Sequence, residues 1–235
     1  MKTIGLIAGM SWKSSLEYYK IMNELVQEKL GGHHCAKIIM YNVDFEELIT
    51  CQRSGNWQKA GEILSNAAQS LEKAGSDLVL ICTNTMHKVA DAVQESINIP
   101  LIHICDAVIT QASRQNIKKV GILGTKYTLQ GDFYCSCFEK NGIQYIIPDD
   151  DEMQKVHDVI FNELCLGEIK DESRIFYKKV IQNMVKKGAE GIILGCTEIQ
   201  LLITQEDSPV PVFDTTYHHA AYAVELALTK ELSLK

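Results

Sequence analysis

Short apolar runs of strand length alternate along the chain with longer stretches in which apolar residues recur at helical spacing. The runs Ile4–Ala8, Leu78–Ile81 and Gly191–Leu194 are typical of buried strands. Residues 57–74 and 173–187 have helical spacing, as do residues 14–30, where the apolar positions are Leu16, Tyr19, Ile21, Leu25 and Val26. Strands that alternate with helices predict an α/β fold with a mostly parallel sheet flanked by helices on both faces.

Three segments of the chain recur in the same order at nearly one offset. The segment from Lys73 matches that from Lys186, Ile4–Gly9 matches Val120–Thr125, and Ile99–Ile102 matches Val210–Phe213, at offsets of 111 to 116 residues. Such a repeat predicts two similar α/β lobes related by pseudo-twofold symmetry. We expect residues 1–100 with 216–235 in the first lobe and residues 101–215 in the second.

The strand ends should place polar loops in a cleft between these lobes, because ligands of open α/β sheets bind beyond the carboxyl ends of the strands. The repeat aligns Thr83 with Cys196, and the polar residues that follow each of them also correspond. Free backbone N–H groups at such loops attract anions. The predicted donors to a bound carboxylate are Asn84, Thr85, Thr125 and Thr197.

Composition narrows the classes of partner. The net charge of −7 disfavours nucleic acid, which requires a clustered basic surface. The apolar runs are too short for a membrane span, and the start of the chain lacks a cleavage pattern, so we expect a cytoplasmic protein. Eight scattered cysteines form no CxxC pair, which predicts free thiols and no metal site.

An ordered set of motifs carries a family resemblance: Gly9-Met-Ser-Trp12, Thr83-Asn-Thr85 with His87, Gly124-Thr125, Gly195-Cys-Thr-Glu198 and Phe213-Asp-Thr215. Over nearly its whole length the chain resembles the aspartate/glutamate racemases, which use no cofactor. The resemblance is nearest to the branch that acts on L-aspartate and L-glutamate. It implies an isomerase, a homodimer, a small acidic amino acid as substrate, and two cysteines that exchange the α-proton on opposite faces of the α-carbon.

The sequence departs from this pattern at one of the two cysteines. Cys196 matches the second, but Thr83 stands where the first is expected, since the following Asn-Thr fixes the register. Cys82 lies one residue early, and a one-residue shift along a strand turns a side chain to the other face. We therefore expect Cys196 and Thr83 to act on the two faces, with the Thr83 hydroxyl donating a proton or positioning water.

Substrate-binding roles follow for several further residues. The resemblance implies a lysine in the second lobe for the side-chain carboxylate, but Cys165 occupies that stretch. Arg53 offers a bidentate cation for this carboxylate and Gln52 a further donor. Met10 and Ser11 belong to the first motif, and Ser11 with Glu198 is a candidate to hold the amino group.

Two other functions remain open at this stage. A maleate isomerase or an arylmalonate-decarboxylase-like enzyme would use one cysteine in the same architecture. A non-catalytic amino-acid binding protein would also have two lobes around a cleft, and loss of one acid/base residue could produce it. Each motif also has a structural interpretation: Cys196 as a core thiol, Thr83–Thr85 as a helix cap, and Arg53 as a solvated charge.

Overall fold

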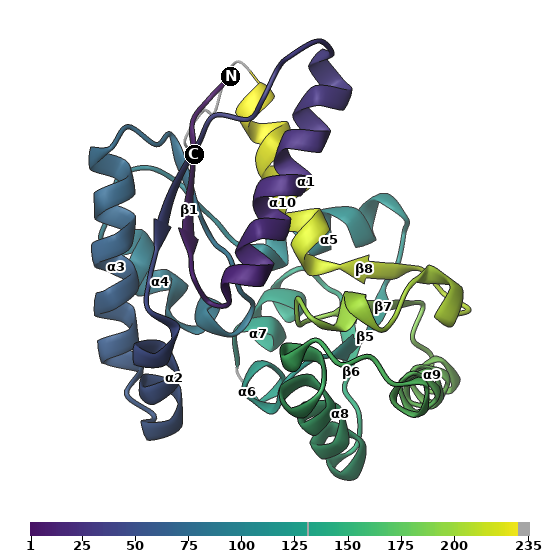
Figure 1. The fold of residues 1–235 in the computed structure, drawn as a ribbon. Helices are drawn as coiled ribbons and strands as arrows, with labels where there is room; N and C mark the ends of the chain where they lie inside the picture. Colours follow the sequence, from purple (N-terminus) through teal and green to yellow (C-terminus); the bar gives the residue numbers. More distant parts are fainter. Residues whose placement is uncertain (131, 230–235) are drawn as a thin grey trace. The chain divides into compact units, whose positions relative to one another are not determined.

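A computed structural model describes residues 1–130 and 132–229 of the chain (Figure 1). The chain divides into two compact units. Unit 1 comprises Met1–Ile104 and the segment from Thr216 onward, and unit 2 comprises Cys105–Thr215.

Unit 1 contains a four-stranded parallel sheet in the order β2-β1-β3-β4. Its strands are β1 (Ile4–Ala8), β2 (Ile38–Asn42), β3 (Leu78–Ile81) and β4 (Leu101–Ile102). Its helices are α1 (Trp12–Leu30), α2 (Phe45–Ser54), α3 (Trp57–Lys73), the 3₁₀ helix η1 (Thr85–Val89), α4 (Ala90–Glu95) and α10 (Thr215–Leu228). Helices α3 and α4 cover one face of the sheet, and α1 with α10 covers the other (Figure 1).

The two faces of this sheet follow from the alternation of side chains along the strands. Ile7 and Ile81 point into the core formed with α2, α3 and α4. Leu6, Leu80 and Cys82 point into the opposite core, where α1 contributes Tyr18, Met22 and Val26, and α10 contributes Ala220, Ala223, Val224 and Ala227.

Unit 2 repeats this arrangement with a parallel sheet in the order β6-β5-β7-β8. Its strands are β5 (Lys119–Leu123), β6 (Gln144–Ile146), β7 (Gly191–Leu194) and β8 (Val212–Asp214). Its α-helices are α5 (Ile104–Arg114, of which Ile104 belongs to unit 1), α6 (Lys126–Leu129), α7 (Asp132–Lys140), α8 (Asp150–Asn162) and α9 (Asp171–Lys186). The 3₁₀ helices are η2 (Leu164–Leu166), η3 (Ile199–Leu201) and η4 (Gln205–Asp207). Each sheet thus joins its four strands in the same chain order, which confirms the predicted α/β fold class of two similar lobes.

The predicted helix over residues 14–30 is part of α1, and only some of its apolar positions are buried. Leu16 and Tyr19 are 53% and 51% exposed, whereas Tyr18, Met22 and Val26 are fully buried. These three residues lie four apart and form one continuous stripe against α10 and the sheet. Spacing alone does not select this stripe, because the large apolar residues of the helix lie on more than one side of it.

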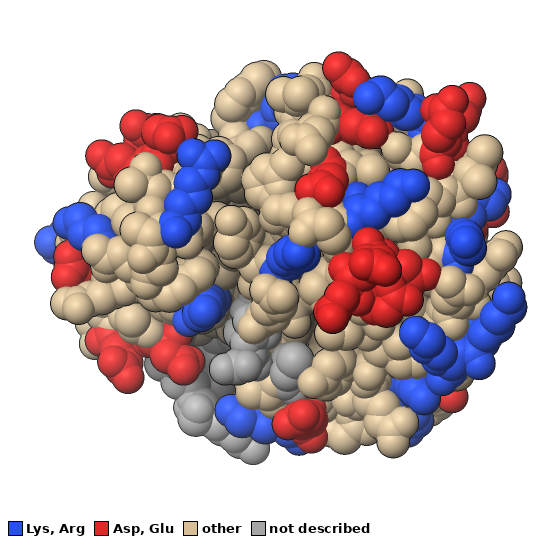
Figure 2. Space-filling view, turned by 90° about the horizontal axis from the view of Figure 1, so that it is seen from below, with Lys and Arg blue, Asp and Glu red and all other residues tan. Residues whose placement is uncertain are grey.

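The surface bears charges of both signs. On the face seen in Figure 2, Lys and Arg side chains are interspersed with Asp and Glu, and acidic groups gather in one compact cluster. Among the described residues, no helix combines the length and the apolar character needed to cross a membrane.

Candidate active site

The loop after β1 is a tight turn built on Gly9. Gly9 has a φ of 98°, and a Cβ there would lie 2.3 Å from the Val43 carbonyl oxygen, so only glycine fits. Its N–H donates to Ser15 Oγ at 2.9 Å, and Ser15 Oγ donates to the Ser11 carbonyl at 2.9 Å. The Ser11 hydroxyl makes no capping hydrogen bond to α1. Met10, expected at the substrate site, is 3% exposed and packs with its side chain in the core.

The loop after β3 presents Thr83 and buries its neighbours. Cys82 is fully buried in the core beneath α1 and α10, and this burial raises the pKa of its thiol. Thr83, the next residue, is partly exposed, as is Thr85, while Asn84 is 2% exposed. The structure thus gives Cys82 a packing environment and leaves the Thr83 side chain accessible at the carboxyl end of the strand.

Gln52 and Arg53 lie in the last turn of α2. The Gln52 amide nitrogen lies 3.1 Å from Met86 Sδ, which brings this end of α2 to the η1 segment that follows Thr85. Arg53 is exposed, and among the described residues its guanidinium has neither an ion pair nor a hydrogen bond. A cation without a protein partner is available to a ligand carboxylate.

Thr125, at the corresponding loop after β5 in unit 2, is engaged as a helix cap. Its Oγ1 accepts from the Thr128 N–H at 3.2 Å and lies 3.1 Å from Thr128 Oγ1, and its side chain is 6% exposed. The residue therefore fixes the start of α6, and its hydroxyl is already used within the fold.

The loop after β7 joins a thiol to a carboxylate. Cys196 Sγ donates to Glu198 Oε2 at 3.1 Å, and Thr197 Oγ1 donates to the same oxygen at 2.7 Å. Burial raises the pKa of the Cys196 thiol well above its usual value of 9.0, and the Glu198 charge and nearby Cys165 raise it further. Cys196 is therefore a protonated thiol at rest, with a proton acceptor already in place.

This geometry changes the expected role of Glu198. One carboxylate oxygen is engaged by Cys196 and Thr197, so only Oε1 is left for the amino group of a substrate. The Glu198 carboxylate is thus a hydrogen-bond partner of the Cys196 thiol. Spacing along the sequence could suggest this, because the two side chains are only two residues apart on one loop.

Residues 7–223 match the Asp/Glu/Hydantoin racemase family. The chain belongs to this family.

Three relatives of this racemase-family chain match almost its whole length. It is 23% identical over 225 residues to the broad specificity amino-acid racemase RacX of Bacillus subtilis, with 91% of this chain and 92% of the relative covered. A crystal structure from Yersinia pestis, provisionally described as an Asp/Glu racemase, is 50% identical with a TM-score of 0.93, and covers 97% of this chain and 100% of its own. An aspartate racemase homologue from Pyrococcus horikoshii is 38% identical with a TM-score of 0.87, and covers 97% and 100%. The resemblance inferred from the motifs is confirmed, and the chain is an isomerase of the racemase class.

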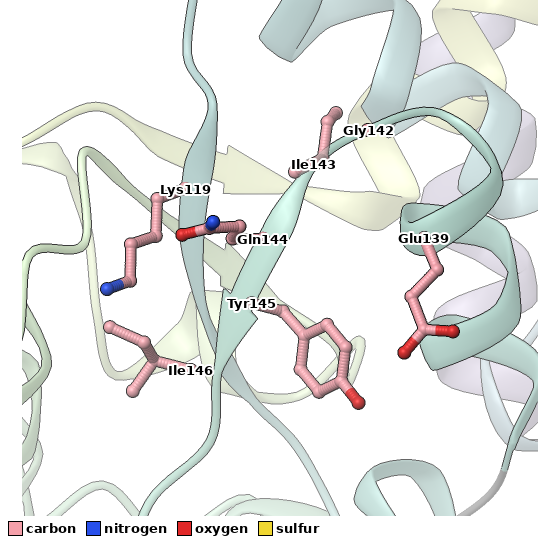
Figure 3. A pocket seen from close by; sticks show the side chains of 7 residues that line it. All are labelled: Lys119, Glu139, Gly142, Ile143, Gln144, Tyr145 and Ile146. Atoms are coloured by element: carbon pink, nitrogen blue, oxygen red, sulfur yellow. The ribbon is translucent and has the colours of Figure 1, made fainter.

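A groove of about 590 Å³ lies elsewhere on unit 2 of this racemase-family protein (Figure 3). It follows β6, the edge strand of the sheet, and its lining residues are Lys119, Glu139, Gly142, Ile143, Gln144, Tyr145 and Ile146. Lys119 and Gln144 are paired at the amino ends of their strands, whereas the motif loops leave the carboxyl ends. The groove is therefore separate from the candidate active site.

Sequence reasoning gave no role to two buried histidines. His87 and His219 are 2% and 0% exposed, and both hydrogen-bond to backbone near the β3 loop and β4. His87 belongs to the motif that begins at Thr83 and lies two residues after Thr85, and this position was the available signal.

Proposed function

We propose that this chain racemises an acidic amino acid, aspartate or glutamate, without a cofactor, with Cys196 and Thr83 acting on opposite faces of the α-carbon. The observation that carries the proposal is the hydrogen bond from Cys196 Sγ to Glu198 Oε2, 3.1 Å long, at the carboxyl end of a buried strand. An adjacent base that can take the proton of a thiol is one arrangement that activates a sulfur.

The raised pKa of Cys196 keeps the group a thiol at rest, so a base must take its proton before it can act. The α-hydrogen of an amino acid is a very weak acid, and the thiolate is the form that can remove it. Glu198 takes the thiol proton, and the thiolate then removes the α-proton of the L-enantiomer. The Thr83 hydroxyl gives a proton to the opposite face and regains one from water, while Glu198 returns its proton to solvent.

The carbanion needs stabilisation where charge develops on the α-carboxylate. Asn84, Thr85 and Thr197, with the loop amides, are the proposed donors, and each preorganised donor can contribute ~3–4 kcal/mol. Ser11 and the free Oε1 of Glu198 would hold the amino group. Thr125 would contribute through the loop that it caps, and Met10 through the packing that fixes the Gly9 turn.

Arg53 is proposed to bind the side-chain carboxylate of the substrate, and Gln52 is proposed as a further donor to it. Its support is the exposed guanidinium that lacks an ion pair among the described residues. The family resemblance further supports a homodimer, which sedimentation of the purified chain would test. The proposed location is the cytoplasm, and the net charge of −7 disfavours nucleic acid as a partner.

Proton NMR in deuterated water tests the function directly. L- and D-aspartate, L- and D-glutamate, a set of neutral amino acids and maleate are each incubated with the protein. We expect loss of the α-proton signal and formation of the opposite enantiomer for an acidic amino acid. Hydration or isomerisation of maleate alone would assign a different reaction of the same architecture, and no exchange with any amino acid would contradict the proposal.

A further inference from the structure

His87 has a tautomer that its partners fix. Its Nε2 lies 3.2 Å from the Ile104 backbone nitrogen, whose N–H can only donate, so Nε2 is the acceptor. The ring proton therefore sits on Nδ1, which donates to the Thr83 carbonyl oxygen at 2.8 Å. One buried imidazole thus ties the Thr83 loop to the start of α5.

The surroundings keep this ring neutral. His87 is 2% exposed, and the ring centroids of His103 and His219 lie 4.6 Å and 5.6 Å away. Burial, with these two neighbours, holds the pKa of His87 well below its usual 6.5. A second proton would also place an N–H of the ring against the Ile104 N–H.

A second buried histidine supports the same segment from the other side. His219 Nε2 donates to the Ile102 carbonyl at 2.8 Å, and its Nδ1 accepts from the Tyr18 hydroxyl at 2.9 Å. The two imidazoles therefore hold the chain on both sides of His103. Of the two imidazoles, His87 is the one that hydrogen-bonds to the Thr83 carbonyl.

We infer that His87 is a positioning residue for Thr83: its Nδ1–H holds the Thr83 carbonyl and thereby fixes the direction of the Thr83 hydroxyl. The Thr83 N–H is also anchored, to the Ile81 carbonyl at 2.9 Å, so the backbone of this residue is held on both sides. Threonine is branched at Cβ and has few accessible χ1 states, so an oriented backbone gives an oriented hydroxyl. The inference rests on the proposed role of Thr83 in protonating one face.

The two faces of the α-carbon can be followed separately. In deuterated water, label that enters the L-substrate without inversion reports the Cys196 face, and formation of the D-product also requires Thr83. A misplaced Thr83 should slow inversion and leave the exchange of the L-substrate intact. A displacement of about 1 Å can cost on the order of 100-fold in rate.

Two substitutions test the Nδ1 and Nε2 positions of the imidazole separately. His87→Asn keeps an amide nitrogen near the Nδ1 position, where it can donate to the Thr83 carbonyl, and His87→Gln places its amide near Nε2. We expect His87→Gln to lower the ratio of inversion to L-exchange at least ~10-fold, and His87→Asn to keep this ratio within ~3-fold of wild type. His219→Gln is the matched control, because it removes an equally buried imidazole and the Nδ1 acceptor of the Tyr18 hydroxyl, and it should lower Tm with the ratio unchanged.

The outcomes separate this inference from the proposed function. Equal losses of inversion and L-exchange in folded His87→Gln, or the same ratio in the Asn and Gln variants, would overturn the positioning role. Failure of Thr83→Ala to alter inversion in an otherwise wild-type protein would instead overturn the role of Thr83 itself. If His87→Gln does not fold while His87→Asn folds with a wild-type ratio of inversion to L-exchange, the requirement for the Nδ1 donor stands. A reduced ratio in His87→Asn with a wild-type Tm contradicts this requirement.

Discussion

Adjacent residues just beyond β3 have opposite environments. Cys82 is buried in the core and Thr83 is partly exposed, the order that the side-chain alternation of the strand would give if it continued past Ile81. Local patterns could not predict the pairing of Tyr18 with His219 or of His219 with Ile102. These partners are 201 and 117 residues apart, and no periodicity links such positions. The spacing places Cys196 and Glu198 on one loop, but only atomic positions show that a single Glu198 oxygen accepts from both Cys196 and Thr197.

Substitution of the two cysteines should separate chemistry from packing. Cys196→Ala should lower kcat/KM for the acidic substrate by ~10³-fold or more, because it removes an acid/base group. Cys82→Ala should keep most activity and lower the free energy of unfolding by about 1–2 kcal/mol, because it leaves a small void in the core. Steady-state kinetics and urea unfolding of both variants would measure this. Equal, mild losses of activity in the two would contradict the assignment of Cys196.

Arg53→Met should weaken the recognition of a side-chain carboxylate. We expect KM for aspartate or glutamate to rise far more than KM for a neutral amino acid, since loss of one partner of a desolvated charge pair costs ~2–5 kcal/mol. Arg53→Lys is the matched control, because it keeps the charge and loses the bidentate geometry. An unchanged preference for acidic substrates in Arg53→Met would show that another residue binds the side-chain carboxylate.

At the scale of elements, apolar runs predicted strands well and helix faces less well. The predicted strand Leu78–Ile81 is β3, and Gly191–Leu194 is β7. Both are fully buried, so a continuous apolar run was a sufficient signal. Helix α1 exposes Leu16 and Tyr19, because tertiary packing selected a stripe that the mixed apolar pattern did not define. Turn geometry, in contrast, depends on single glycines.

Gly9→Ala tests how the turn after β1 is built. A Cβ at Gly9 would meet the Val43 carbonyl oxygen at 2.3 Å, in addition to the strain of a φ of 98°. Gly55 has a φ of 70° at the end of α2 with no atom within 4 Å of its Cβ position. We expect Gly55→Ala to cost ~1 kcal/mol and Gly9→Ala at least ~3 kcal/mol in chemical unfolding. Similar costs would mean that the Val43 backbone moves aside easily.

At the scale of the whole molecule, the internal repeat was the most informative sequence signal. It predicted two lobes of one fold class, and the two sheets have the same strand order. The relation between the lobes, and hence the cleft, stays a prediction, because no local pattern encodes it. The pH dependence of stability, in contrast, follows from buried groups that titrate.

Acid should destabilise the protein through its buried histidines. Burial lowers the pKa of His219 from 6.5 to about 3 and that of His87 in the same direction, so below pH 6.5 the unfolded chain binds protons that the folded one does not. The free energy of unfolding should therefore fall as the pH falls from 6.5 toward 5, by up to ~1.4 kcal/mol per pH unit for each histidine. Urea unfolding at pH 7, 6 and 5 would measure the slope. His219→Gln should reduce this slope by nearly the contribution of one proton, ~1.4 kcal/mol per pH unit. An undiminished slope in that variant would show that other groups dominate the pH dependence.

The discontinuity of unit 1 has a consequence for synthesis on the ribosome. Unit 2 is one uninterrupted stretch, Cys105–Thr215, and it emerges complete while α10 is still to be translated. The core beneath α1 lacks Ala220, Ala223 and Val224 until that moment, and Tyr18 lacks its partner His219. We therefore expect the central portion of the nascent chain to fold first, with the earlier-made sheet left half-covered. The sheet of unit 1, although translated before unit 2, would thus be among the last parts to reach its final packing.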